Sequence, residues 1–240
     1  MHHVTLDSWS RIGSPIHRLD ARVKILAVLA VLLSLVLTEH AYLWLFASYF
    51  SLIFTLAWLA RLPLAALLLR AALVLPFAAT VAALNVFGGT AVRAAAVLGK
   101  SYLSALAVLV LLASTPLHVL LRGLESLGAP RFFLMVAQFV YRYLFVLSEQ
   151  AQHMKQARRC RAGQGGRGGR SLGASAAGAL AVLFARSYCR AERIHHAMLA
   201  RGFQGQFAAA RPPSLRAADL VFLSVTGAVI AALQVLLWNR

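Results

Sequence analysis

The sequence predicts an all-α, polytopic integral membrane protein with about five transmembrane helices and additional long cytoplasmic helices. Hydrophobic residues make up 60% of the 240 residues, more than the share of about half that is typical of soluble domains. The chain carries 24 Lys and Arg against 7 Asp and Glu, and this formal net charge of +17 fits a basic cytoplasmic face. A soluble nucleic-acid-binding protein would have the charge but would lack the long apolar runs.

The N-terminal part, residues 1–114, is predicted to contain about four membrane spans and to begin in the cytoplasm. Basic residues between His17 and Lys24 precede the first apolar run, and such residues tend to stay on the cytoplasmic side. The first apolar run extends from Ile25 to Thr38. The second extends from Ala41 to Ala60 and follows a tight turn at Glu39-His40.

The third and fourth spans are expected on either side of a glycine pair. Ala71 to Phe87 forms the third span, in which Pro76 introduces a kink, and Gly88-Gly89 closes it. Ser101 to Ser114 forms the fourth, which is short unless Ala94 to Gly99 joins it. The connection before it contains two basic residues that this topology places outside the cell, Arg93 and Lys100.

A shorter helix is predicted after the fourth span. Thr115 is its expected N-cap and Pro116 its first helical residue, a position where the missing N–H of proline costs nothing. The helix stops at Gly128-Ala129-Pro130.

Residues 115–214 are predicted to form a cytoplasmic block that contains two long helices with basic ends. Between His153 and Arg216 lie twelve Lys and Arg and a single acid, Glu192, and such a segment should remain in the cytoplasm. The long helices are expected from Arg131 to Ala162 and from about Leu172 to Arg201, lying along or dipping into the inner leaflet.

Two further features complete the organisation. Adjacent glycines disfavour a helix, so four glycines between the long helices are a candidate hinge, with a plain linker as the alternative: Gly165, Gly166, Gly168 and Gly169. Residues 215–240 supply the last span, Ala218 to Trp238, which leaves the C-terminus outside.

The sequence offers no catalytic constellation. The adjacent pair His195-His196 is a poor metal site, because neighbouring side chains point about 100° apart on a helix. The two cysteines, Cys160 and Cys189, lack metal-ligand spacing. Because no nucleophile–base pair or close pair of carboxylates is visible, neither an enzyme nor a metal site nor a cofactor is expected.

Short motifs follow one another along nearly the whole chain: Leu19-Asp20-Ala21-Arg22-Val23-Lys24, Leu62-Pro63, Ser114-Thr115-Pro116, Leu127-Gly128-Ala129-Pro130, Tyr141-Arg142-Tyr143, Arg190-Ala191-Glu192-Arg193 and Ala200-Arg201-Gly202. In this order they resemble the T component of an energy-coupling-factor (ECF) transporter, in the CbiQ-like subfamily associated with cobalt and nickel uptake. Ala21 stands where that family usually has proline.

The resemblance implies two ATPase-coupling motifs, each an arginine between small residues at the end of a long helix. The second stands here as Ala200-Arg201-Gly202, as in the family. The first aligns best with Cys160-Arg161-Ala162, where both neighbours differ from the family's alanine and glycine, and Ala157-Arg158-Arg159 is an alternative placement. An arginine at a helix C-terminus is favoured by the helix dipole and presents a planar fork to carboxylates and carbonyls.

The same resemblance implies a non-catalytic coupling subunit of an ATP-driven importer for cobalt or nickel, linked to cobalamin biosynthesis and located in the bacterial plasma membrane. The implied partners are two ATP-binding cassette (ABC) ATPase subunits, a substrate-binding membrane (S) subunit of CbiM type and membrane lipid, without nucleic acid. An alternative interpretation is a membrane-anchored protein that binds anionic lipid or RNA through residues 153–216. The ordered motifs favour the coupling subunit.

Overall fold

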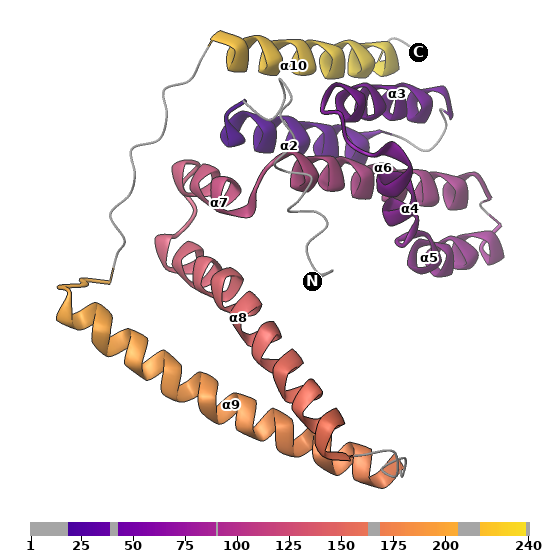
Figure 1. Cartoon of the computed structure of the whole chain (residues 1–240). Helices are drawn as coiled ribbons and strands as arrows, with labels where there is room; N and C mark the ends of the chain where they lie inside the picture. Colours follow the sequence, from indigo (N-terminus) through magenta and orange to yellow (C-terminus); the bar gives the residue numbers. More distant parts are fainter. Residues whose placement is uncertain (1–18, 39–42, 90, 163–168, 206–216, 239–240) are drawn as a thin grey trace. The chain divides into compact units, whose positions relative to one another are not determined.

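The computed structural model describes residues 19–38, 43–89, 91–162, 169–205 and 217–238, and every regular element in these ranges is an α-helix (Figure 1). The helices are α2 (Ala21–Leu37), α3 (Leu43–Leu59), α4 (Leu64–Ala72), α5 (Leu75–Phe87), α6 (Ala91–Ser114), α7 (Leu117–Ser126), α8 (Arg131–Ala162), α9 (Gly169–Ala200) and α10 (Ala217–Trp238). The all-α prediction is confirmed. The chain forms two units, residues 1–128 with 212–240, and residues 129–211.

Within the described ranges, three helices are long and apolar enough to cross a membrane: α6, α8 and α10. Helices α4 and α5 are bent by 46° at a short break, and together they would make a fourth span. Helices α2 and α3 have 17 residues each, or roughly 26 Å, slightly less than a hydrocarbon core of about 30 Å. The chain is therefore a polytopic, all-helical membrane protein, as predicted.

The expected third span, Ala71 to Phe87, is wrong in its boundaries. Helix α4 begins earlier, at Leu64, and ends at Ala72, and α5 begins at Leu75. The break follows from Pro76, because the proline ring clashes with the carbonyl four residues earlier, that of Ala72, and proline has no N–H to donate.

Helix α6 begins at Ala91, so Ala94 to Gly99 join the fourth span. Arg93 and Lys100, expected in a connection, both lie inside the helix. The Lys100 ammonium donates to the carbonyl oxygens of Thr38 (2.6 Å) and Val36 (3.4 Å), at the C-terminal end of α2. In return, Lys24 of α2 donates to the carbonyl oxygen of Ser114, the last residue of α6 (3.3 Å). The two helices are therefore antiparallel, and each places a cation on the carbonyl end of the other, where the helix dipole favours positive charge.

The predicted N-cap of α7 is also wrong. Pro116 occupies the N-cap position, without a side-chain hydrogen bond to the helix. The Thr115 hydroxyl instead accepts a hydrogen bond from the buried Lys24 ammonium (3.2 Å). Helix α7 lies close to α2 at Gly123, where an added Cβ would come within 3.0 Å of the Ala21 Cβ.

The core of this first unit lies between α2, α3, α4, α6 and α10. Tyr49, Leu35 and Leu67 are fully buried in it, and Ile230 brings α10 into the same cluster. The start of α10 is tied to the start of α2, because the Asp20 backbone N–H donates to the Asp219 carboxylate (2.9 Å). This hydrogen bond joins residues that are 199 positions apart in the sequence.

The second unit consists of the two long helices α8 and α9, with 32 residues each. They lie close together where α8 ends and α9 begins, and they diverge from there (Figure 1). Helix α8 has the predicted boundaries, Arg131 and Ala162. Helix α9 begins at Gly169, three residues before the predicted Leu172, and its last helical residue is Ala200.

Candidate coupling surface on helices α8 and α9

Helix α9 ends in a well-defined hydrogen-bonded stop. The Phe203 N–H donates to the carbonyl oxygen of Met198 (3.0 Å), and the Gly202 N–H donates to that of Leu199 (2.9 Å). This pattern is a Schellman motif, which requires a left-handed residue after the helix. Gly202 has a φ of 76° and supplies that conformation. Arg201 is therefore the C-cap residue and is exposed, and the hydrogen bonds of Gly202 and Phe203 to the last turn of α9 hold its backbone in place.

Helix α8 ends differently. Its last turn contains Arg159 and Arg161, and Ala162 is still helical. Both arginines lie where the helix dipole favours a cation. The glycine that turns the chain after Arg201 has no counterpart at Ala162, so the two motifs are not equivalent in backbone conformation.

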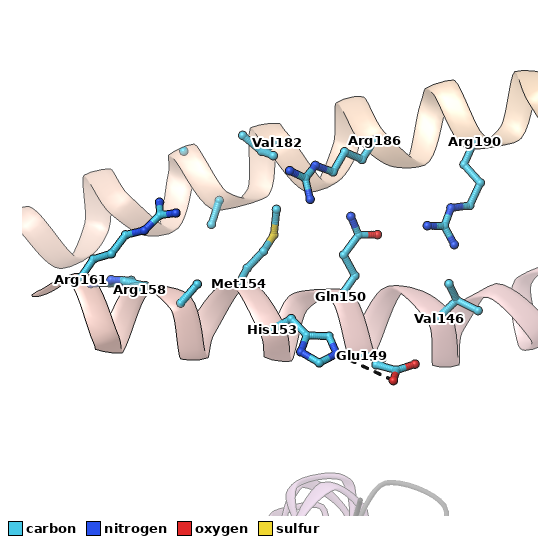
Figure 2. A pocket seen from close by; sticks show the side chains of 13 residues that line it. Val146, Glu149, Gln150, His153, Met154, Arg158, Arg161, Val182, Arg186 and Arg190 are labelled. Atoms are coloured by element: carbon cyan, nitrogen blue, oxygen red, sulfur yellow. Dashed lines mark ion pairs between the residues drawn. The ribbon is translucent and has the colours of Figure 1, made fainter.

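A groove of about 1060 Å³ lies between α8 and α9. Its lining from α8 is Val146, Glu149, Gln150, His153, Met154, Ala157, Arg158 and Arg161, and its lining from α9 is Gly178, Ala179, Val182, Arg186 and Arg190. Figure 2 shows Arg161 and Gln150 extending from α8 toward α9, with Arg186 and Arg190 extending the other way. Arg159 is not among the lining residues.

The groove is strongly basic. It contains four arginines and one acid, Glu149, whose carboxylate lies 3.9 Å from the His153 ring nitrogen. In Figure 2 this pair lies on the side of α8 that faces away from α9. Within the described part of the chain, no carboxylate forms an ion pair with any of these arginines.

The structure thus separates the predicted coupling arginines. Arg158 and Arg161 line the groove, Arg159 lies outside it, and Arg201 occupies the exposed end of α9. Sequence reasoning missed the groove residues Gln150, Arg186 and Arg190. The signal was present as helical spacing, because residues three or four positions apart share a helix face.

Other predicted features are only partly described. Gly165, Gly166 and Gly168 lie outside the described residues, and Gly169 is the first residue of α9. The rings of His195 and His196 lie 6.0 Å apart. Within the described ranges, no group of three or more His, Cys, Asp or Glu side chains is arranged to hold a metal ion.

Comparisons with known proteins agree with the helical membrane architecture. A family model described as "Cobalt transport protein", named CbiQ, matches residues 13–211. A protein of Methanocaldococcus jannaschii described as uncharacterized is 24% identical over 257 residues, covering 98% of this chain and 86% of that protein. The cobalt transport protein CbiQ of Rhodobacter capsulatus is 31% identical over 121 residues, covering 50% of this chain and 49% of the relative. The chain thus belongs to the CbiQ cobalt transport protein family and is an integral membrane component of cobalt transport.

Proposed function

We propose that the protein is the T component, the transmembrane coupling subunit, of an ATP-driven ECF importer. Its substrate is cobalt, as the name of the Rhodobacter capsulatus relative suggests, with nickel as the alternative. The protein itself catalyses no reaction and needs no cofactor. Two ABC ATPase subunits hydrolyse ATP, and a substrate-binding membrane subunit of CbiM type binds the metal ion.

The observation that carries this proposal is the end of α9. Arg201 is exposed at the C-cap, and the small residues Ala200 and Gly202 leave its backbone accessible to a partner. A planar guanidinium in this position suits a carboxylate or a cluster of carbonyl groups on an ATPase subunit. Arg161, in the last turn of α8, would make the corresponding contact with the second ATPase, and Arg158 and Arg159 are the alternatives.

The first unit supports a cytoplasmic position for residues 115–214. The Lys24 ammonium donates to the end of α6, and the backbone N–H of Asp20, the N-cap residue of α2, donates to Asp219 at the start of α10. The chain between α6 and α10 therefore leaves and re-enters the membrane on the same face. A single crossing by α8 is incompatible with this parity unless α9 crosses back, and the described part of α9 is not apolar enough over a sufficient length to cross a membrane.

The distribution of basic residues supports the cytoplasmic assignment of that face. The twelve Lys and Arg between His153 and Arg216 favour the cytoplasmic side. This orientation puts the N-terminus in the cytoplasm and the C-terminus outside, in the plasma membrane of a bacterium. Residues 1–114 then form the N-terminal membrane part, residues 115–214 the coupling part, and residues 215–240 the last span.

The test compares two arginines on the same helix. Arg201→Ala removes the exposed C-cap cation, whereas Arg193→Ala removes a mid-helix cation whose Nε donates to the Cys189 carbonyl oxygen (3.2 Å). Losing one partner of a desolvated charge pair costs roughly 2–5 kcal/mol, and losing a rim charge costs much less. Cobalt uptake in cells and ATPase recovery with the purified subunit should both fall for Arg201→Ala and Arg161→Ala, but not for Arg193→Ala.

Arg201→Lys should restore uptake only in part, because lysine keeps the charge but lacks the planar fork. Equal and mild losses for Arg161, Arg193 and Arg201, abolished by high salt, would indicate a lipid anchor and contradict the coupling role.

A further inference from the structure

The first turn of α2 is a junction of four helices. The buried Lys24 ammonium donates to the carbonyl oxygen of Ser114, the last residue of α6 (3.3 Å), and to the Thr115 hydroxyl (3.2 Å). One turn earlier, the Asp20 N–H donates to the Asp219 carboxylate of α10 (2.9 Å). The carboxylates of Asp20 and Asp219 also attract the Lys24 ammonium electrostatically. The ends of α6 and α10 and the residue that leads into α7 are therefore bonded to one turn of α2.

The same turn holds both ends of the chain segment that forms the coupling helices. The second unit consists of residues 129–211, so the chain passes to it after α7 and returns from it before α10. Thr115 comes shortly before α7, and Asp219 lies in the first turn of α10. Lys24 thus holds the outgoing connection, and the Asp20 N–H holds the returning one.

Helix α7 also packs tightly against this turn. An added Cβ at Gly123 would lie 3.0 Å from the Ala21 Cβ and 3.2 Å from the Ile25 Cδ1. Close-packed contacts have low compressibility and transmit strain. Residues 127–130 are all that separates α7 from α8 in the sequence, so a displacement of α8 acts on α7 through a short connection.

We propose that Lys24 is a positioning residue that transmits the movement of the coupling helices to the membrane helices. This inference rests on the proposed coupling function. A buried ammonium is costly unless it is paired and hydrogen-bonded, so the helix ends that satisfy Lys24 cannot move away from it without a large loss of free energy. A movement of the connection between α6 and α7 therefore displaces α2 and is not absorbed by a loose loop.

Lys100 offers a comparison within the same helix pair. Its ammonium makes the same kind of bonds at the opposite end of α2 and α6, to the carbonyl oxygens of Thr38 and Val36. That end of α2 leads to α3, within the first unit. Both lysines hold α2 and α6 together, but of the two it is Lys24 that lies where the chain passes to the second unit.

The test measures cobalt uptake and ATP hydrolysis in proteoliposomes that contain the complete transporter. Lys24→Met should keep ATPase recovery and ATP hydrolysis within about twofold of the wild type, while the cobalt taken up per ATP falls at least about fivefold, because bonds from a charged donor are lost. Lys100→Met loses a similar set of bonds and should keep this ratio within about twofold of the wild type, because it lies outside the proposed path.

A second pair of variants changes the acceptor instead of the lysine. Thr115→Ser keeps the hydroxyl that accepts from Lys24, and Thr115→Val replaces it with a methyl group of similar size. The cobalt-to-ATP ratio should fall in Thr115→Val and remain close to that of the wild type in Thr115→Ser. This pair decides the question if Lys24→Met does not fold, and equal ratios in the two variants would overturn the proposal.

The outcomes separate this proposal from the coupling function on which it rests. A wild-type ratio in Lys24→Met would overturn the positioning role and leave the coupling subunit in place. An equal fall in Lys24→Met and Lys100→Met would indicate a general loosening of α2 against α6 and would also overturn it. Failure of the wild-type chain to recover the ATPase subunits would refute the proposed function itself.

Discussion

The stop at the end of α9 gives a sharp test of why a glycine follows Arg201. At a φ of 76°, an L-residue at position 202 incurs a backbone cost of about 1–2 kcal/mol. An added Cβ would meet no other atom within 4 Å, so the cost of Gly202→Ala comes from the backbone conformation and not from a clash. A change of this size shifts the equilibrium between the capped and the frayed helix end by roughly 5- to 30-fold.

We therefore expect Gly202→Ala to reduce cobalt uptake and ATPase recovery, because Arg201 loses its fixed position. Gly202→Asn should retain most activity, since asparagine tolerates the left-handed conformation far better than alanine does. Gly227→Ala is the control, because its added Cβ also meets nothing within 4 Å and it lies inside α10, which does not line the groove and where alanine favours the helix.

Two results would refute this reasoning. Uptake by Gly202→Ala equal to that of the wild type would mean that the helix stop does not position Arg201. Equal loss in Gly202→Asn and Gly202→Ala would mean that glycine is needed for space against a partner and not for its backbone conformation.

Three further predictions concern topology, the membrane unit and the linker. The exposed native cysteines, Cys160 and Cys189, should react in intact cells only with a thiol reagent that crosses the membrane. As a control, Gly88→Cys in a variant that lacks both native cysteines should also react with an impermeant reagent. Labelling of the native pair by the impermeant reagent would contradict the proposed topology. Lys24→Met and Lys100→Met should each lower the apparent Tm of the detergent-solubilised protein, because each removes hydrogen bonds from an ammonium to the end of a helix, worth roughly 1–3 kcal/mol. Replacing an exposed lysine, as in Lys155→Met, should leave the Tm unchanged. Equal Tm values for all three variants would show that the bonds of Lys24 and Lys100 to the helix ends do not stabilise the protein. Replacing Gly165, Gly166, Gly168 and Gly169 by alanine should stabilise the helical conformation of the linker by up to about 1 kcal/mol per site. Cobalt uptake should fall while the transporter complex still assembles. Unchanged uptake would mean that these glycines form a plain linker and not a hinge.

The sequence alone determined the helical membrane class and the boundaries of α8. Apolar runs and the excess of basic residues are properties of composition, and a helix that ends near glycines can be located from local preferences. The same local chemistry identified Arg201 between Ala200 and Gly202, because the glycine that permits a left-handed stop is adjacent in the sequence. The break at Pro76 was anticipated in kind, although it divides the segment earlier than expected.

Only the tertiary structure decided the roles of Lys24, Lys100 and the groove residues. Lys100 looked like a loop residue because a charge inside an apolar run is costly unless it is paired, and its partner is the end of a helix more than sixty residues away. Gln150, Arg186 and Arg190 form one groove only because α8 and α9 pack against each other. Hydrogen bonds and grooves between distant segments depend on packing geometry, which local sequence patterns do not encode.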